Sequence, residues 1–348
     1  MEMLWFWLVS VMLAIYVVMD GFDFGAGILH LVVARTNEER REVLGAIGPL
    51  WDGNEVWLLA GGGSLFLAFP KVLASGFSGF YLAMWLVVWC LMLRGISIEF
   101  RSHVEDGLWR QFWDVTFAVS SVLLPVLLGA ALGNVLRGVP LDASGYFALP
   151  LWTDFRLGPQ PGVLDWYTVL IGVFALVTVG AHGSLFLAWK TEGPVHDRSR
   201  DLAPKLWGAV VMLWILVSGA TFVANPSIYR NLPQAPLAWA ATLVFLGGLA
   251  VVFLGLRRNQ HLLAFLGSGA FILGLLAATA ANVYPVMLKS TLDGAFDLTA
   301  LNASVGQHGL RTGLAWWVIG FPIAIGYVLF IFRFHRGKVK APAEGEGY

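Results

Sequence analysis

Long apolar runs, separated by short polar connections, dominate the chain. A helix needs roughly 20 apolar residues to cross a bilayer, and nine runs meet this requirement. They cover residues 3–33, 45–69, 76–98, 113–136, 166–189, 206–224, 236–256, 261–284 and 312–332. The first run is longer than a bilayer requires, so we expect it to tilt or to project from the membrane. The pattern predicts an all-α integral membrane protein with nine transmembrane helices.

The connections between these runs leave no room for a second folded unit. The longest is 137–165, which is rich in Pro and Gly and is predicted to be an ordered surface loop. We therefore expect a single polytopic membrane domain over residues 1–332. Residues 333–348 form a short polar tail, predicted to be disordered.

Composition supports a membrane location and excludes some kinds of chemistry. Hydrophobic residues make up 58% of the chain, charged residues 13%, and mean hydropathy is +0.73, whereas soluble domains carry about 25% charged residues. The start of the chain lacks the basic segment of a cleavable signal, so we expect the first run to remain as a helix. The single cysteine, Cys90, excludes an internal disulfide and any metal site built from several thiolates. No feature favours nucleic-acid binding.

The distribution of Lys and Arg predicts the orientation. Of 22 basic residues, 16 fall on one side of the predicted topology, the side that also carries the C-terminal tail. Because basic loops stay in the cytoplasm, we expect an outside N-terminus and a cytoplasmic C-terminus. The protein is expected in a bacterial or archaeal cytoplasmic (inner) membrane.

Several charged residues interrupt the apolar runs, all on the cytoplasmic side of the predicted topology. "MDGFDFGAGIL" and "PLWDGNEVWLL" each hold two acids spaced i, i+3, which share one helix face. Gly21 and Gly25 flank the first pair and would allow a neighbouring backbone to approach closely. The charged residues that the topology brings to this depth are Asp20, Asp23, Asp52, Glu55, Arg94, Glu99 and Arg101.

Acids at this depth must face protein, water or a cation. An aspartate at the centre of a membrane helix costs roughly 2.5–3.5 kcal/mol. One interpretation is a structural knot in which Arg94 and Arg101 neutralise the acids and lock the first three helices together. The other is a path for protons or cations, which intramembrane acids often mark. The two interpretations are compatible.

The histidines do not suggest a haem site. Axial ligation within a bundle needs His, or His and Met, facing one another. Only His182 lies well inside a predicted span, beside Gly180 and Gly183, so we expect it to form hydrogen bonds between helices. We expect no haem iron and no other metal to take a ligand from this chain.

Five stretches of the sequence together carry a family resemblance. "MDGFDFGAGIL", "PLWDGNEVWLL", "SGFSGFYL", "LRGISIEFR" and "YPVMLKSTL" resemble subunit II of the cytochrome bd family of quinol oxidases. The resemblance covers nearly the whole chain and includes the nine-helix count. The form "RGISIEFR" is closer to the cyanide-insensitive branch of that family. Trp51, Gly53 and Asn54 belong to the second motif, and we expect packing roles for them.

The resemblance implies an architecture and a partner. The nine helices would form two four-helix bundles plus one peripheral helix, packed against a homologous subunit I. Subunit I would carry haems b and d, or b-type haems only, together with the quinol-oxidising loop, and would reduce oxygen to water. The resemblance also allows a structural quinone in this chain, a small single-helix subunit, and contacts with lipid.

The resemblance also implies roles for single residues. Asp23 and Asp52 match acids that the family uses in a proton route from the cytoplasm. Asp20 and Arg94 match their motif neighbours, whose roles are less defined. Glu55 is Gln in some relatives, so the resemblance does not imply an obligatory role for Glu55.

We therefore expect a non-haem subunit that stabilises subunit I and supplies part of a cytoplasmic proton path, without being catalytic alone. A rival class is a proton- or cation-coupled secondary transporter that uses Asp20, Asp23 and Asp52. Broken helices and an inverted repeat would favour that class. A purely structural scaffold is the second rival.

Overall fold

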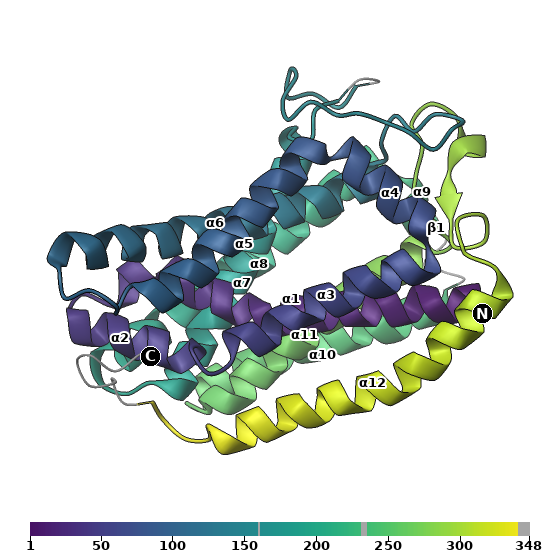
Figure 1. Ribbon diagram of the computed structural model, residues 1–348. Helices are drawn as coiled ribbons and strands as arrows, with labels where there is room; N and C mark the ends of the chain where they lie inside the picture. Colours follow the sequence, from purple (N-terminus) through teal and green to yellow (C-terminus); the bar gives the residue numbers. More distant parts are fainter. Residues whose placement is uncertain (159–160, 231–234, 340–348) are drawn as a thin grey trace.

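The computed structural model describes residues 1–158, 161–230 and 235–339, and most of these residues are helical (Figure 1). The long helices are α1 (Glu2–Val33), α3 (Trp51–Ala68), α5 (Tyr81–Phe100), α6 (Gly107–Arg137), α7 (Trp166–Lys190), α8 (Gly193–Ala224), α10 (Pro236–Arg257), α11 (His261–Val283) and α12 (Gln307–Phe334). Shorter helices are α2 (Asn37–Ile47), α4 (Pro70–Gly79) and α9 (Ser227–Arg230). Two short strands, β1 (Val286–Leu288) and β2 (Leu298–Thr299), pair antiparallel, with a 3-10 turn at Gly294–Phe296 between them.

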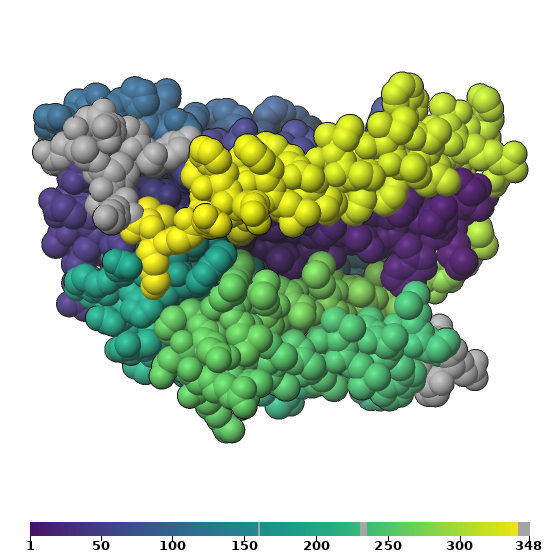
Figure 2. Space-filling view, turned by 90° about the horizontal axis from the view of Figure 1, so that it is seen from below, coloured from purple at the N-terminus to yellow at the C-terminus, as the bar shows by residue number. Residues whose placement is uncertain are grey.

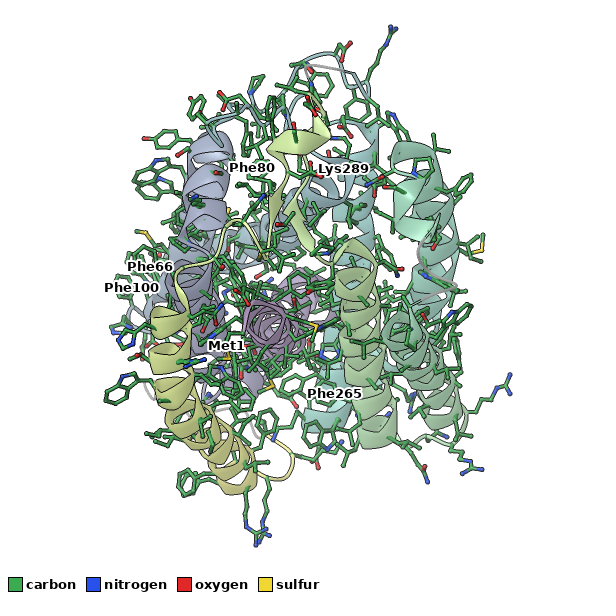
Figure 3. The ribbon with its side chains drawn as sticks, turned by 90° about the vertical axis from the view of Figure 1, so that its right-hand side faces the viewer. Met1, Phe66, Phe80, Phe100, Phe265 and Lys289 are labelled. Carbon is green, nitrogen blue, oxygen red and sulfur yellow. The ribbon has the colours of Figure 1, made fainter. Side chains whose placement is uncertain are left out.

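The long helices run along one common direction with α1 at the centre (Figures 1 and 3). Within the described ranges, eight helices are long and apolar enough to cross a membrane, and nine if the bent pair α3 and α4 counts as one span. We name the two ends of the molecule by their landmarks, the α2 end and the hairpin end, where β1 and β2 lie (Figure 1). α1 starts at the hairpin end, and α12 finishes at the α2 end.

The predicted run 45–69 was wrong at its start. Residues 45–47 belong to α2, a separate helix that begins with a capping box between Thr36 and Glu39. α3 begins only at Trp51, after the turn at 48–50. The apolar residues at the end of α2 are buried against the rest of the bundle, so apolar composition alone merged two helices into one run.

The predicted connection between residues 69 and 76 was also wrong. Residues 70–79 form α4, which meets α3 at an angle of 116°. Pro70 has no N–H to continue the hydrogen bonds of α3 and is well suited to the first turn of a new helix. The next span, α5, therefore begins at Tyr81 and not at residue 76. The remaining spans lie where they were predicted, although α8 begins 13 residues earlier, at Gly193.

A close approach between α1 and α7 fixes the centre of the bundle. A Cβ atom on Gly25 would lie 2.6 Å from the Cα of Gly183, so neither position can carry a side chain without separating the helices. Gly25 therefore lies at the closest contact between α1 and α7 that these glycines form. At Gly21 the nearest atom, in Val179, is 3.5 Å from the same test position, which is an ordinary contact.

The hairpin end is closed by loops that pack on one another. The connection over residues 138–165 contains buried apolar side chains and is tied to its neighbours by backbone hydrogen bonds. Leu149 N donates to Gly79 O over 3.1 Å, and Val139 N donates to Lys289 O over 2.9 Å. The described part of this connection is thus an ordered surface loop, as predicted.

Helix α12 lies at the edge of the molecule as a separate ridge, in contact with α3 and separated by α1 from α10 and α11 (Figure 2). Trp5 Nε1 donates to Leu310 O over 2.9 Å at one end, and Tyr327 packs on Gly53 towards the other. After α12 the chain reaches the end of α7, where Val339 N donates to Lys190 O over 2.7 Å and Lys190 Nζ donates to His335 O over 2.6 Å. We call this connection the terminal strap (residues 335–339). Residues 340–348 of the predicted tail lie outside the described residues.

Candidate functional site

A buried arginine joins acids from two other helices near the α2 end. Arg94 of α5 forms ion pairs with Asp20 of α1 and, over 3.1 Å, with Glu55 of α3. Arg94 and Asp20 have no exposed surface, whereas the side chain of Glu55 is 24% exposed. The guanidinium also lies 4.6 Å from the centre of the Phe24 ring, a favourable cation–π distance. The structure thus brings together three of the predicted residues.

The second acid of α1 has a different partner from the one expected. Asp23 Oδ2 accepts a hydrogen bond from Asn54 Nδ2 over 2.8 Å, and both side chains are buried. Asp52, which we placed at the same depth as Asp23, is instead exposed on the surface of α3. Asn54 lies two residues further along α3, which rotates it about 200° around the helix from Asp52. Asn54 therefore has a site contact as well as the expected packing role.

One buried carboxylate oxygen of Asp23 has no hydrogen-bond partner within the described structure. Asp20, by contrast, interacts with the Tyr16 side chain as well as with Arg94. Buried polar atoms are normally hydrogen-bonded, and ordered water often supplies the missing partner. Asp23 therefore keeps an acceptor position that no described residue uses.

An open groove of about 480 Å³ reaches the cluster from the side. It lies between α3 and α5, and its charged lining residues are Asp52, Glu55 and Glu99. Trp51 forms part of the wall and packs over Gly95 of α5, with a closest distance of 3.2 Å to a Cβ position there. Glu55 thus links the groove to Arg94 and Asp20.

A second charged cluster lies nearer the α2 end. Asp114 of α6 is fully buried and pairs with Arg101 Nε over 2.5 Å, with His30 Nε2 over 2.6 Å and with Arg40 Nη1 over 2.9 Å. Arg101 also donates to Asn37 Oδ1 over 3.0 Å. We had placed Arg101 beside Arg94 in one network; it belongs instead to this separate cluster. Sequence reasoning missed both Asp114 and His30, although a carboxylate early in the run 113–136 was a usable signal.

The histidine in the middle of the membrane is held by two hydrogen bonds. His182 Nδ1 lies 2.6 Å from Ser268 Oγ, and Nε2 lies 3.0 Å from Val18 O. The ring stacks on Phe265 at a centroid distance of 4.8 Å. His182 therefore joins α1, α7 and α11, as expected for a hydrogen bond between helices. Within the part of the chain that the structure describes, no group of three or more His, Cys, Asp or Glu side chains could hold a metal ion.

Two adjoining apolar cavities lie behind the acid cluster, towards the hairpin end. One has a volume of about 450 Å³ and is lined mainly from α1, α6, α7 and α11; the other, of about 310 Å³, extends towards α8 and α10. Val17, Leu132 and Leu276 border both cavities. Tyr16 and Phe24 separate the first cavity from the charged residues. These volumes fall in the range that organic ligands occupy.

Comparison with known proteins gives the same result for sequence and for structure. A family model described as "Cytochrome bd terminal oxidase subunit II" matches residues 1–335. The chain is 31% identical over 337 residues to "Cytochrome bd ubiquinol oxidase subunit 2" of Bacillus subtilis (strain 168), covering 97% of this chain and 96% of that protein. It is 28% identical over 365 residues to "Cytochrome bd-I ubiquinol oxidase subunit 2" of Escherichia coli (strain K12), covering 97% and 95%.

A solved structure shares the fold. The match is to a chain in "The structure of bd oxidase from Geobacillus thermodenitrificans", with a TM-score of 0.72 and 18% sequence identity. The alignment covers 96% of this chain and 98% of that one.

Proposed function

Because this chain belongs to the subunit II family of cytochrome bd terminal oxidases, we propose that its buried acids carry protons towards the site of oxygen reduction. The chain is a subunit of a quinol oxidase and works in a complex with a subunit I. The relatives give no support to the rival transporter class. The bend of 116° between α3 and α4 lies at the hairpin end, away from the acids.

The proposed direction of proton flow follows from charge. The helix ends and connections at the α2 end hold 14 of the 22 Lys and Arg residues of the chain: Arg35, Arg40, Arg41, Arg101, Arg110, Lys190, Arg198, Arg200, Lys205, Arg257, Arg258, Arg333, Arg336 and Lys338. By the positive-inside rule this end faces the cytoplasm, which leaves the N-terminus outside in a bacterial or archaeal inner membrane. Asp20 and Asp23 then lie in the cytoplasmic half of the bundle, where protons for water formation must be taken up.

The observation that carries the proposal is the free acceptor capacity of the buried acid Asp23. A knot built only for stability would use its carboxylate oxygens, because burying an unpaired polar atom costs about 1–3 kcal/mol. Here Asp23 keeps one oxygen without a partner among the described residues, three residues from Asp20 on α1. A water molecule at this oxygen would connect Asp23 to Asp20, and Glu55 would connect the acids to the groove.

The groove is the proposed contact with subunit I. Three carboxylates on a lateral face would be costly against lipid, at about 2.5–3.5 kcal/mol for a central position. Large apolar side chains are exposed on the same side of the molecule: Phe100 borders the groove and is 45% exposed, and Phe66, further along α3, is 65% exposed (Figure 3). We infer that subunit I covers this face and accepts protons from the groove. A small single-helix subunit would have to dock elsewhere, for example beside α12.

The same proposal assigns no redox group to this chain. The haems, b and d or b-type only, would be held by subunit I, since both nitrogens of His182 already have partners. The two apolar cavities suit the isoprenoid tail of a structural quinone. The bundle arrangement, two four-helix bundles with α12 outlying, also belongs to this proposal, and the marginal position of α12 supports it.

The test is an isosteric change of the acid that has an amide partner. Asp23→Asn keeps the size of the side chain but cannot carry a proton as an acid. We expect the complex to assemble with normal haem absorption and to lose oxygen consumption on the order of 100-fold, the lower range for loss of a proton-transfer group. A matched control is Asp142→Asn at the hairpin end, where the hydrogen bond from the Ser144 hydroxyl lowers the pKa of a carboxyl far from the cluster.

Two outcomes would contradict the proposal. Normal oxygen consumption by Asp23→Asn, at normal haem content, would make the acids structural. An equal loss in Asp142→Asn would show that the assay reports general damage to the subunit. Asp52→Asn should have a smaller effect than Asp23→Asn, because Asp52 is exposed at the groove and water can replace it.

A further inference from the structure

The contact between α1 and α6 carries polar groups from the α2 end to the acid cluster. On α1, Asp23, Gly27 and His30 follow one another at i, i+4 and i+7, so they share one stripe of the helix. On α6, Asp114 and Ser121 are also seven residues apart. Seven residues span about 10 Å along a helix. The two stripes face each other, because His30 contacts Asp114 and Gly27 contacts Ser121.

We call this contact between α1 and α6 the seam. His30 lies at its α2 end, and one of the two ring nitrogens of His30 already has a partner. Its Nε2 pairs with Asp114, which is anionic because Arg101 from α5 and Arg40 from α2 also bind it. These are the charged groups that face His30 from the elements packed around it. The Arg40 side chain is 27% exposed, so the cluster reaches the surface at the α2 end. The other ring nitrogen, Nδ1, is buried and has no partner among the described residues.

Two further buried polar atoms along the seam also have no hydrogen-bond partner among the described residues. The hydroxyl oxygen of Ser121 is fully buried and unpartnered, and so is one carboxylate oxygen of Asp23. Ser121 packs where Gly27 has no side chain, which places its hydroxyl between the levels of His30 and Asp23. Three buried polar atoms without a partner among the described residues therefore follow one another along the contact between α1 and α6.

We propose that His30 takes up protons at the α2 end and passes them through Ser121 to Asp23. The inference rests on the proposed function of the acid cluster and adds its uptake side. In the step, Nδ1 of neutral His30 binds a proton that the cytoplasmic solvent supplies as hydronium through water entering beside Arg40, and the imidazolium stays paired with Asp114. Nδ1 then returns this proton to Ser121 Oγ, directly or through one water, while the Ser121 hydroxyl proton moves to the Asp23 carboxylate. One proton is transferred, and His30 and Ser121 are regenerated.

The ring of Phe117 packs beside this seam, next to His30. Its ring lies 5.3 Å from the His30 ring, edge to face, and 3.1 Å from a Cβ position on Gly27. The ring therefore lies against the contact between α1 and α6 at the level of His30 and Gly27, where it limits the room for water.

The experiment compares proton uptake by assembled oxidase variants in proteoliposomes during a single turnover with oxygen. His30→Gln keeps a donor to Asp114 but cannot exchange a proton at neutral pH, and Ser121→Ala removes the middle hydroxyl. Asp23→Asn is the benchmark for the acid cluster. Ser199→Ala on α8 is the matched control, because the Ser199 hydroxyl is also buried and unpartnered but lies away from the seam.

We expect His30→Gln to slow proton uptake on the order of 100-fold, at normal haem content, and Ser121→Ala to lie between it and the control. A different result would refute the path through His30 and Ser121: Asp23→Asn slows proton uptake, but His30→Gln and Ser121→Ala take up protons as fast as Ser199→Ala. In that case the proton-carrying role of the acid cluster is retained, and protons enter through the groove. If His30→Gln fails to assemble, Ser121→Ala decides alone. Normal uptake by Asp23→Asn would overturn the proposed function, and this inference with it.

Discussion

Removing the charge of Arg94 should damage the bundle more than removing either acid. Arg94→Leu replaces a fully buried guanidinium by an apolar side chain and leaves Asp20 and Glu55 without a cation. At the 3.1 Å separation from Glu55 and an effective dielectric constant of about 20, one such pair amounts to about 5 kcal/mol of attraction. Breaking a buried pair by deleting one partner costs about 3–5 kcal/mol of stability.

Replacing Asp20 or Glu55 should reduce the stability of the complex less than Arg94→Leu, because Arg94 keeps other partners. In Asp20→Asn the guanidinium keeps Glu55 and the Phe24 ring, so we expect a loss of about 1–3 kcal/mol, that of one hydrogen-bonding partner. Glu55→Gln should cost least, because the Glu55 side chain is 24% exposed and water can replace its charge.

The assay is the thermal midpoint of the purified complex, followed by its haem absorption, for the single variants and for the double variant Asp20→Asn/Arg94→Leu. Because the double variant removes the cation together with one of its acids, it should be more stable than the sum of the singles by about 0.5–3 kcal/mol. Additive losses, or an Arg94→Leu complex as stable as the parent, would refute the reasoning.

Three further predictions follow from single features. Gly25→Leu should prevent assembly, since its Cβ would lie 2.6 Å from Gly183, whereas Gly62→Leu, with no atom within 4 Å of its Cβ position, should assemble; equal yields would contradict the close approach. His182→Ala should leave the haem bands of the complex intact, and loss of a band without loss of subunits would show that His182 is a ligand. A reporter fused after Tyr348 should be active only in the form that reports from the cytoplasm, and a signal from the outer side would reverse the proposed orientation.

The sequence was sufficient to locate helices whose apolar character is continuous. α7 was predicted over 166–189 and spans Trp166–Lys190, because span length and hydropathy are local properties. The same reasoning failed at residues 45–79, where two separate helices and a bend share one apolar composition. A window of hydropathy averages over a change of direction, so only Pro70 marked the place where the chain turns.

The sequence was sufficient to predict which residues belong to the candidate site, but not which of them contact one another. The i, i+3 spacing identified the acids, but the rotation of α3 about its own axis decides whether Asp52 or Asn54 meets Asp23, and that rotation is set by distant packing. The same holds for His30 and Asp114, which are 84 residues apart and meet only because α1 contacts α6.

The terminal strap has a consequence for biogenesis. α12 follows the other described helices in the chain and lies at the edge of the bundle (Figure 2). The strap then fastens the chain beyond α12 to Lys190 and Thr191 of α7, a helix made much earlier, with Lys338 Nζ donating to Thr191 O over 2.8 Å. We therefore expect a chain truncated after Phe334 to keep the described helices but to lack the tether that holds α12 to the end of α7.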